Sequence, residues 1–275
     1  MPEGDTIYRA ARTLNRALAA SLITRFESEF PALNRVADDR PIVGRTIESV
    51  SPRGKHLLFA LSGGLVLRTH MRMHGSWHIY RHGERWHRPR CELRILLETD
   101  RFVAAGFSIP VAEFIAEREL PRHRELAALG PDPLSAAFDP HEVVARMRPR
   151  RGAIAELLLD QRVIAGIGNV LKAEALFVAG VDPFAATSSL SDDVLERVVA
   201  TARRLMAVNT LDDARVGGAA RGRRTTGSMN PAAKLWVYDR AGRPCRRCGT
   251  PIAVGKTGAD ARATYWCPVC QPRQT

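Results

Sequence analysis

The two residues after Met1, Pro2 and Glu3, are the first in the chain whose types suggest covalent chemistry. Removal of Met1 would give Pro2 a free secondary amine, whereas a proline inside a chain has an amide nitrogen with no lone pair to offer. About a tenth or two of an α-amino group is free base at pH 7, and this form can attack an aldehyde-level carbon to give an iminium ion. Glu3 places a carboxyl beside it for proton transfer. The same residues also occur as a plain translation start, so the rest of the chain must decide.

Four of the five cysteines have the spacing of a four-thiolate zinc site rather than of a disulfide framework: Cys245-x2-Cys248-x18-Cys267-x2-Cys270. The segment between the two pairs predicts a β-hairpin that is held at its base by metal. Because so short a segment has no core of its own, one structural Zn²⁺ would supply its folding energy.

Two glycine turns carry groups that suit phosphate. Gly166-Ile167-Gly168-Asn169 separates two predicted helices, and Asn169 can cap the second helix or reach outward. Amides at a helix N-terminus attract anions, so this helix-turn-helix predicts a grip on phosphate. The turn Arg53-Gly54-Lys55 precedes a strand, and by itself Lys55 has the plain interpretation of a solvated hairpin lysine.

The charge of the chain indicates a polyanionic partner. Its 275 residues carry 41 Lys and Arg against 29 Asp and Glu, a net charge of +12, and cations placed on phosphates gain affinity by releasing counterions. The chain lacks a basic amphipathic helix, a lipidation motif, a signal peptide and an apolar stretch of the roughly 18 residues that a membrane span needs. We therefore expect a soluble, cytoplasmic protein that does not bind membranes.

The elements that must position these residues fall into three predicted parts. Helical periodicity begins at Thr6, with Asp5 or Thr6 as N-cap, and continues to Ala20. Strand signals extend from Ile23 to about Phe107 and favour a β-sandwich or barrel. The predicted strands are 46–50, 55–61, 65–70, 76–80, 91–98 and 101–107. Cys91, at the start of one of them, is interpreted as a small core residue.

After Pro121 the periodicity becomes helical, with predicted helices over 142–147, 152–160, 170–179 and 192–207. The Gly- and Arg-rich run 216–227 is either a solvated linker or a loop that closes on a substrate. The predicted fold is thus a multidomain α+β protein. It has a β-sandwich with a flanking helix at 1–120, a helical domain at 121–235 and a zinc-finger β-hairpin at 236–275.

Taken together, the motifs resemble the formamidopyrimidine-DNA glycosylase and endonuclease VIII family of base-excision repair enzymes. The resemblance covers the whole chain and consists of five elements in order: Met1-Pro2-Glu3-Gly4, Arg53-Gly54-Lys55, Gly130-Pro131-Asp132, Gly166-Ile167-Gly168-Asn169 and the four-cysteine hairpin. The opening Met-Pro-Glu-Gly is more similar to the endonuclease VIII branch.

The resemblance implies a bifunctional DNA glycosylase/AP lyase that removes oxidised bases, preferably pyrimidines, and cleaves the strand by β,δ-elimination. It implies that Pro2 forms the Schiff base, that Glu3 is the general acid on the sugar, and that Lys55 contacts phosphate and serves in β-elimination. Arg262 would grip phosphates and assist δ-elimination, and Asn169 would bind the DNA backbone within a helix-two-turn-helix.

The family flips the damaged base out of the duplex and fills the gap that it leaves. The resemblance assigns this step to the loop 70–75, with Arg72, Met73 and His74 contacting DNA and Met73 as the wedge. Thr6 stands where the family often has a second glutamate, for which Asp5 can substitute, and Ala128 stands where it often has a basic residue. The implied partner is double-stranded DNA with a damaged base or abasic site, bound by a monomer that is nucleoid-associated in a bacterial cell.

Two other interpretations remain open at this stage. The cluster His70, His74, His78, His82 and His87 could form a second metal site, but without a carboxylate partner solvated or DNA-facing histidines are preferred. The chain could also be a non-catalytic zinc-ribbon protein that binds nucleic acid. That hypothesis explains the charge, the cysteines and the glycine turn, and it leaves Pro2 and Glu3 unexplained.

Overall fold

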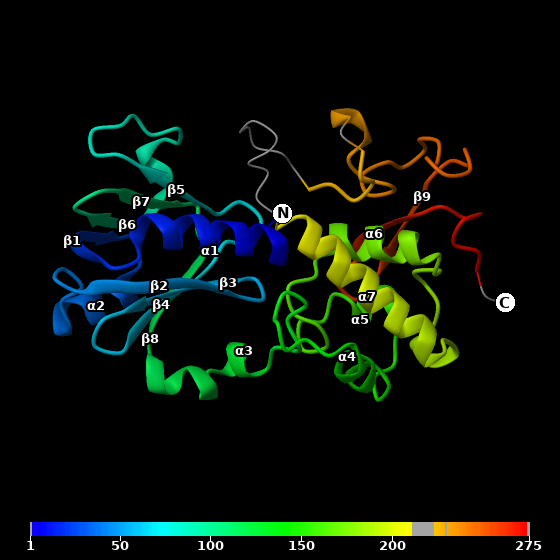
Figure 1. Cartoon of the computed structure of the whole chain (residues 1–275), viewed down its shortest axis with the longest axis horizontal. Coiled ribbons are helices and arrows are strands. Elements are labelled where there is room, and N and C mark those ends of the chain that lie inside the picture. Colours follow the sequence, from blue (N-terminus) through cyan, green and yellow to red (C-terminus); the bar gives the residue numbers. More distant parts are fainter. Residues whose placement is uncertain (1, 211–222, 229, 274–275) are drawn as a thin grey trace. The chain divides into compact units, whose positions relative to one another are not determined.

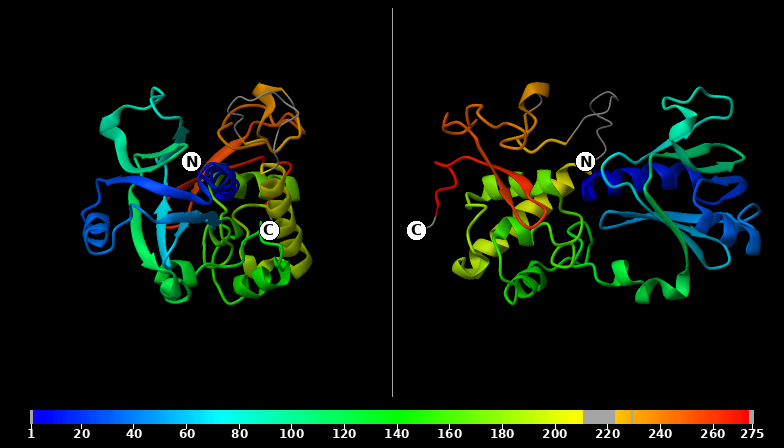
Figure 2. Two further views of the ribbon diagram at one scale, coloured as in Figure 1. Left: turned by 60° about the vertical axis from the view of Figure 1, so that its left-hand side comes forward. Right: turned by 180° about the vertical axis from the view of Figure 1, so that it is seen from behind.

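The computed structural model describes residues 2–210, 223–228 and 230–273. They form two compact units, Met1–Ala128 and Leu129–Thr275, each with its own core. Figures 1 and 2 show the first unit in blue to green and the second in green to red. Most of the run 216–227, interpreted above as linker or loop, lies outside the described residues.

Helix α1 (Gly4–Leu18) opens the first unit. Its buried residues Ile7, Ala11, Leu14 and Leu18 recur every three to four positions, so one apolar stripe faces the core. The helix packs on β2 and also contacts β3 and β5. It begins two residues earlier than the sequence predicted, and Glu3 rather than Asp5 or Thr6 is the N-cap residue.

Eight antiparallel strands follow α1 in one continuous sheet with the order β5-β7-β6-β1-β2-β3-β4-β8. The strand β1 pairs with β2 only at Ser21 and Leu22 and with β6 from Ile23 onward, so it passes from one half of the sheet to the other. The two halves enclose a core with α1, which confirms the predicted β-sandwich. The strands are β1 (Ser21–Ser28), β2 (Thr46–Arg53), β3 (His56–Leu61), β4 (Leu65–His70), β5 (Ser76–Tyr80), β6 (Leu93–Thr99), β7 (Val103–Phe107) and β8 (Val111–Ala116).

Three parts of this unit differ from the sequence prediction. The strands β1 and β8 have no counterpart among the six predicted strands. Helix α2 (Pro31–Asp39) was missed because Leu33 is its one buried residue, which leaves no apolar periodicity to read. Cys91 is exposed in the short helix η1 (Arg90–Glu92), so its interpretation as a core residue was wrong. The unit ends with η2 (Glu117–Arg122) and α3 (Arg124–Ala127).

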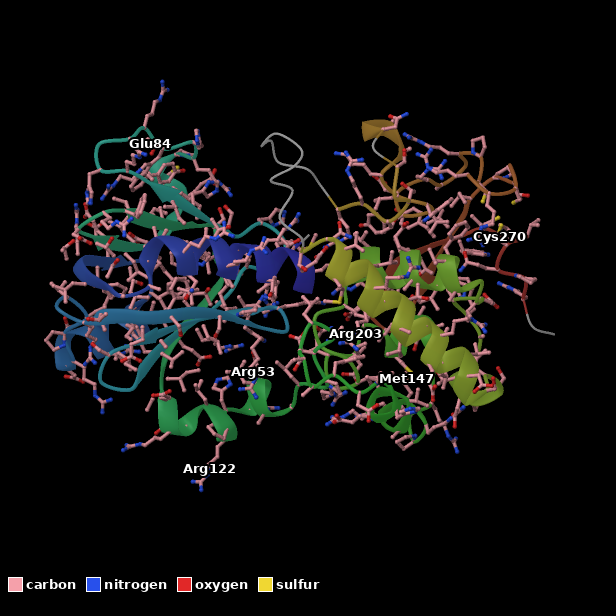
Figure 3. The ribbon with its side chains drawn as sticks, viewed as in Figure 1. Arg53, Glu84, Arg122, Met147, Arg203 and Cys270 are labelled. Carbon is pink, nitrogen blue, oxygen red and sulfur yellow. The ribbon has the colours of Figure 1, made fainter. Side chains whose placement is uncertain are left out.

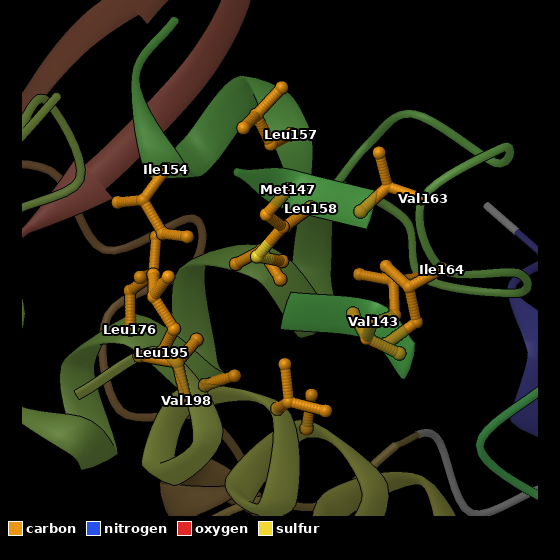
Figure 4. Close-up of a cluster of buried hydrophobic side chains, with 14 of the residues drawn as sticks. Val143, Met147, Ile154, Leu157, Leu158, Val163, Ile164, Leu176, Leu195 and Val198 are labelled. Atoms are coloured by element: carbon orange, nitrogen blue, oxygen red, sulfur yellow. The ribbon is translucent and has the colours of Figure 1, made fainter. Parts of the chain in front are cut away.

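The second unit is helical around a core of aliphatic side chains, part of which is drawn in Figure 4. Its helices are α4 (Pro140–Met147), α5 (Ile154–Leu157), α6 (Asn169–Ala179), η3 (Thr187–Ser189), α7 (Asp192–Val208) and η4 (Pro231–Ala233). The helix predicted over 152–160 is reduced to the four residues of α5. Ala153 pairs with Ala186 in an isolated β-bridge, which keeps the chain extended up to that point.

The hairpin of β9 (Ala253–Thr257) and β10 (Arg262–Trp266) forms a second sheet, and β10 packs against α6. No helix among the described residues is long and apolar enough to cross a membrane.

Candidate active site

Pro2 and Glu3 lie at the head of α1, which orders the backbone around them. The amide of Ile7 donates to the carbonyl of Glu3 over 2.9 Å, the first hydrogen bond of the helix. The Glu3 side chain is fully buried, whereas Pro2 is half-buried. Asp5 is also fully buried, and its carboxylate accepts from the amide of Thr6 at 2.7 Å. Residue 2 therefore directly precedes a helix start at which the side chains of Glu3 and Asp5 are both buried.

Lys55 lies at the tip of the β2–β3 hairpin. Arg53 and His56 pair across it, so Gly54 and Lys55 make a two-residue turn with a positive φ of 58° at Gly54. Figure 3 labels Arg53, the last residue before this turn. The turn leaves Lys55 half-buried at the end of two paired strands.

The loop 70–75 between β4 and β5 carries an exposed apolar side chain. Arg72, Met73 and His74 are exposed, and Met73 keeps 59 % of its surface accessible. Gly75 closes the turn with a hydrogen bond to Met71, and a Cβ on Gly75 would lie 2.6 Å from the Met71 carbonyl oxygen. Arg72 has a positive φ of 45°, an unusual conformation for a residue with a side chain. The tight backbone thus holds Met73 outward.

A buried polar network that the sequence did not reveal lies next to this loop. Arg68, in the middle of β4, donates through Nε to His56 Nδ1 at 3.2 Å. The rings of His56 and His70 meet edge to face with centroids 4.8 Å apart, and the amide of Arg72 donates to His70 Nδ1 at 3.0 Å. The sequence held one signal for this network: Arg68 is a charged residue in a strand whose other residues are mostly buried.

Both imidazoles of this network are kept neutral. Burial, reinforced by Arg68, lowers the pKa of His56 from 6.5 to about 2. Burial, reinforced by Arg72, lowers the pKa of His70 to about 4.

The free energy of unfolding should consequently fall as the pH drops from about 6.5 toward 4, because the unfolded chain then binds protons that the folded chain excludes. Each of the two histidines adds a slope of at most about 1.4 kcal/mol per pH unit in this window. Urea unfolding at several pH values measures the slope, and His70→Gln should make it shallower. A slope that is unchanged in this variant would contradict the assignment.

Two other histidines of the predicted cluster, His78 and His82, make contacts within the fold. The ring of His78 bonds to Ser76 Oγ at 3.0 Å and stacks parallel to Tyr80. His82 Nδ1 lies 3.1 Å from Glu98, so the expectation that the cluster lacks a carboxylate partner was wrong for His82. Among the described residues, these histidines belong to no group that could hold a metal ion.

In the second unit, Asn169 is the first residue of α6, and Gly168 is the N-cap. Asn169 Nδ2 donates to the carbonyl of Ala263 in β10 at 2.8 Å, so the side chain joins the helix to the hairpin and does not cap the helix. Gln161 supports the turn by accepting from Gly166 N and donating to the Ile167 carbonyl, each at 3.0 Å.

Two further polar side chains of α6, which sequence reasoning missed, are fully buried. The ammonium group of Lys172 donates to Asn169 Oδ1 at 2.6 Å and to Thr264 Oγ1 at 2.7 Å. The carboxylate of Glu174 accepts from the three amides of residues 236–238, at 2.8 to 2.9 Å. Buried charges must be paired or hydrogen-bonded. Lys172 therefore ties α6 to the hairpin, and Glu174 ties it to the segment that leads into the hairpin.

Arg262 is the first residue of β10 and directly precedes Ala263. Its side chain is 46 % exposed and makes an ion pair of 3.3 Å with Asp260. The structure therefore brings Arg262 and the N-terminus of α6 into one part of the second unit, through the Asn169–Ala263 hydrogen bond.

The four predicted cysteine ligands also come together. All four Sγ atoms lie within 4.8 Å of one another, with 3.9 Å between Cys245 and Cys270 and 3.4 Å between Cys248 and Cys267. Tetrahedral Zn–S bonds of about 2.3 Å would place sulfur atoms about 3.8 Å apart. Cys270, labelled in Figure 3, is half-buried, and burial raises the pKa of its thiol to about 12. The donor set fits one tetrahedral metal ion.

Comparisons with known proteins agree with this architecture. Residues 1–107 match the formamidopyrimidine-DNA glycosylase N-terminal domain, and residues 129–215 match the formamidopyrimidine-DNA glycosylase H2TH domain. The chain is 41 % identical to the probable endonuclease 8 2 of Streptomyces coelicolor, over 98 % of this chain and 94 % of that protein. It is 38 % identical to the DNA-(apurinic or apyrimidinic site) lyase Nei2 of Mycolicibacterium smegmatis, over 98 % and 99 %.

A solved structure shares the fold. The formamidopyrimidine-DNA glycosylase of Lactococcus lactis, crystallised with DNA containing an AP site, superposes with a TM-score of 0.82. It is 23 % identical, and the match covers 98 % of this chain and 100 % of that one. The order of domains, the curated relatives and the fold lead to one conclusion: the chain belongs to the formamidopyrimidine-DNA glycosylase family, on its endonuclease VIII side.

Proposed function

We propose that this enzyme is a bifunctional DNA glycosylase/AP lyase of base-excision repair that uses the Pro2 amine as its nucleophile. Family membership makes it a DNA glycosylase with lyase activity. The observation that supports the role of Pro2 is its position at the ordered head of α1, next to the fully buried Glu3. In the proposed complex the buried Glu3 carboxyl would lie beside the reacting sugar, where water does not compete with it for proton transfer.

In the proposed reaction the Pro2 nitrogen attacks C1′ of the damaged nucleotide, and the C1′–N bond to the base breaks. Glu3 donates a proton to O4′ as the sugar ring opens, which leaves an iminium between Pro2 and C1′. The iminium acidifies the C2′–H bond. Loss of that proton expels the 3′ phosphate by β-elimination, in which Lys55 serves, and Arg262 assists the following δ-elimination of the 5′ phosphate.

Binding of DNA is divided between the two units. We assign backbone contacts to Asn169 and Arg262, which lie together in the second unit, and gap filling to Arg72, Met73 and His74 in the first. The exposure of Met73 supports the role of wedge, because an apolar side chain can replace the stacking of an extruded base.

We assign one structural Zn²⁺ to Cys245, Cys248, Cys267 and Cys270. It would hold the base of the hairpin that presents Arg262, and the four thiolates leave no position for a reacting water. We propose three functional parts, with catalysis at 1–120, the helical DNA grip at 121–235 and the zinc finger at 236–275. We infer that a monomer acts on double-stranded DNA at the nucleoid, in the bacterial cytoplasm.

The direct test is cleavage of a duplex that contains one abasic site. The proposed chemistry releases the sugar and leaves a gap of one nucleotide with phosphate at both ends when both eliminations proceed. Tight binding without any cleavage by a protein whose intact mass shows that Met1 has been removed would instead support the non-catalytic zinc-ribbon hypothesis.

The lesion spectrum should favour oxidised pyrimidines. Ring-saturated bases stack poorly and cost less to extrude, so we expect thymine glycol or dihydrouracil to leave faster than 8-oxoguanine opposite cytosine. Single-turnover rates, measured on duplexes that differ only in the damaged base, decide which base is released faster. Faster release of 8-oxoguanine would move the chain to the formamidopyrimidine branch and leave the Pro2 chemistry intact.

A further inference from the structure

Arg68 is a charged residue inside a β-sheet. Its neighbour Leu67 faces the sandwich core with Leu57 and Phe59, whereas Arg68 lies on the opposite face of β4, toward α3. Only 2 % of its surface is exposed. Arginine is almost never buried to this degree without partners, because removing the guanidinium from water is costly.

The guanidinium is bound on three sides. It forms ion pairs with Glu113, which lies directly opposite on β8, and with Glu125 of α3. Its Nε–H is directed at His56 Nδ1. The two carboxylates are 37 % and 62 % exposed, so they stand at the rim while the cation lies inside. A planar fork with fixed donors can serve three acceptors in different directions, which a lysine ammonium on a flexible chain does poorly.

From Arg68 the network continues to the loop 70–75. His56 accepts at Nδ1, so the proton of the neutral ring is on Nε2. His56 and His70 are cross-strand partners in the β3–β4 register and meet edge to face. His70 in turn accepts at Nδ1 from the amide of Arg72, the residue with positive φ that precedes Met73. One chain of contacts thus leads from α3 to the base of the exposed Met73.

A buried ion pair is weak evidence for stability, since apolar residues of similar volume often serve as well. Here the same face of the sheet already holds the buried Leu58 and Val66, so an apolar residue at 68 would suit the packing. What an apolar residue would not do is select the tautomer and orientation of His56.

We propose that Arg68 is a positioning residue for base extrusion: through His56 and His70 it sets the backbone of the loop 70–75 and thereby the direction of Met73. The inference rests on the proposed function, because it needs Met73 to enter the DNA. Arg68 itself touches neither DNA nor the reacting atoms.

The test compares Arg68→Met with the wild type in two single-turnover assays. Excision of a damaged pyrimidine from a duplex needs the base to be extruded and should slow by about 100-fold, as for other misplacements near 1 Å. Cleavage at a preformed abasic site has no base to extrude and should change by less than about threefold. Arg25→Met removes an arginine that is half exposed on β1 and ion-paired with Glu27, and it should match the wild type in both assays.

Two further measurements separate positioning from a general loss of structure. In ¹⁵N spectra at neutral pH, Nδ1 of His56 should be unprotonated in the wild type and should take up a mixture of tautomers in Arg68→Met. The variant His56→Phe should slow excision similarly, and the double variant should be no slower than Arg68→Met, since both act through one path. Arg68→Lys should not restore the rate.

Equal slowing of excision and abasic-site cleavage, or an excision rate within threefold of the wild type, would overturn the proposal. If Arg68→Met fails to fold, Glu125→Gln removes one arm at the exposed rim, and excision should still slow by about tenfold relative to abasic-site cleavage. A wild-type protein that cleaves neither substrate would refute the proposed function instead.

Discussion

Borohydride should trap this protein covalently on an abasic duplex only when the nitrogen of Pro2 is free. Reduction captures the iminium between the amine and C1′, and an amide nitrogen cannot form one. A tag left on the N-terminus should therefore abolish the adduct, whereas the same tag at the C-terminus should leave most of it. The adduct is measured as a shifted band on a denaturing gel, and its mass locates the attachment at residue 2.

The side chain of Lys55 is the obvious competing amine, since it is half-buried and the proposed mechanism uses it in β-elimination at the same nucleotide. Lys55→Met with a free N-terminus should still form the adduct, although strand cleavage after it should be slow. Trapping that survives a blocked N-terminus and is lost in Lys55→Met would replace the proline mechanism with a lysine one.

Cys248→Ser and Arg262→Ala should both stop strand cleavage, and they should do so for different reasons. Loss of one thiolate removes the metal that holds the base of the hairpin, and the contacts of β10 with α6 alone should not keep Arg262 in place. Arg262→Ala should keep one equivalent of zinc, measured by a colorimetric chelator, and lose DNA affinity. Its binding should also depend less on salt, with a slope smaller by about one unit for one lost phosphate contact.

Lys256→Ala is the matched control, since Lys256 is an exposed cation on the other strand of the same hairpin. It should retain zinc and cleavage. Cleavage by Arg262→Ala at the wild-type rate would remove Arg262 from the site. Redox activity of the metal, or a rate that depends on a metal-bound water, would contradict a structural zinc.

The sequence alone was sufficient for the features that depend on local chemistry. The knuckle spacing of the cysteines predicted that the two pairs converge on one site, and the structure gathers all four Sγ atoms within 4.8 Å of one another. The strand 76–80 and the two-residue turn at Gly54 and Lys55 follow from alternation and glycine placement over a few residues. The order of motifs along the chain was enough to identify the family, which the comparisons show.

Elements with little local signal needed the tertiary structure. Helix α2 buries only Leu33, and the predicted helix over 152–160 gives way to a β-bridge with Ala186, which lies more than thirty residues away. In both places a distant contact, which no window of neighbouring residues contains, decides the conformation.

The buried polar side chains show the same division most clearly. Lys172 and Glu174 stand out in the sequence of an apolar helix, but their partners at Thr264 and at residues 236–238 are brought to them only by the fold. Likewise Arg68 finds its acceptors on β3, β8 and α3. The sequence determined which groups were available for chemistry. The tertiary structure decided which of them are buried together, because the cost of burying a charge is met by partners that lie far apart along the chain.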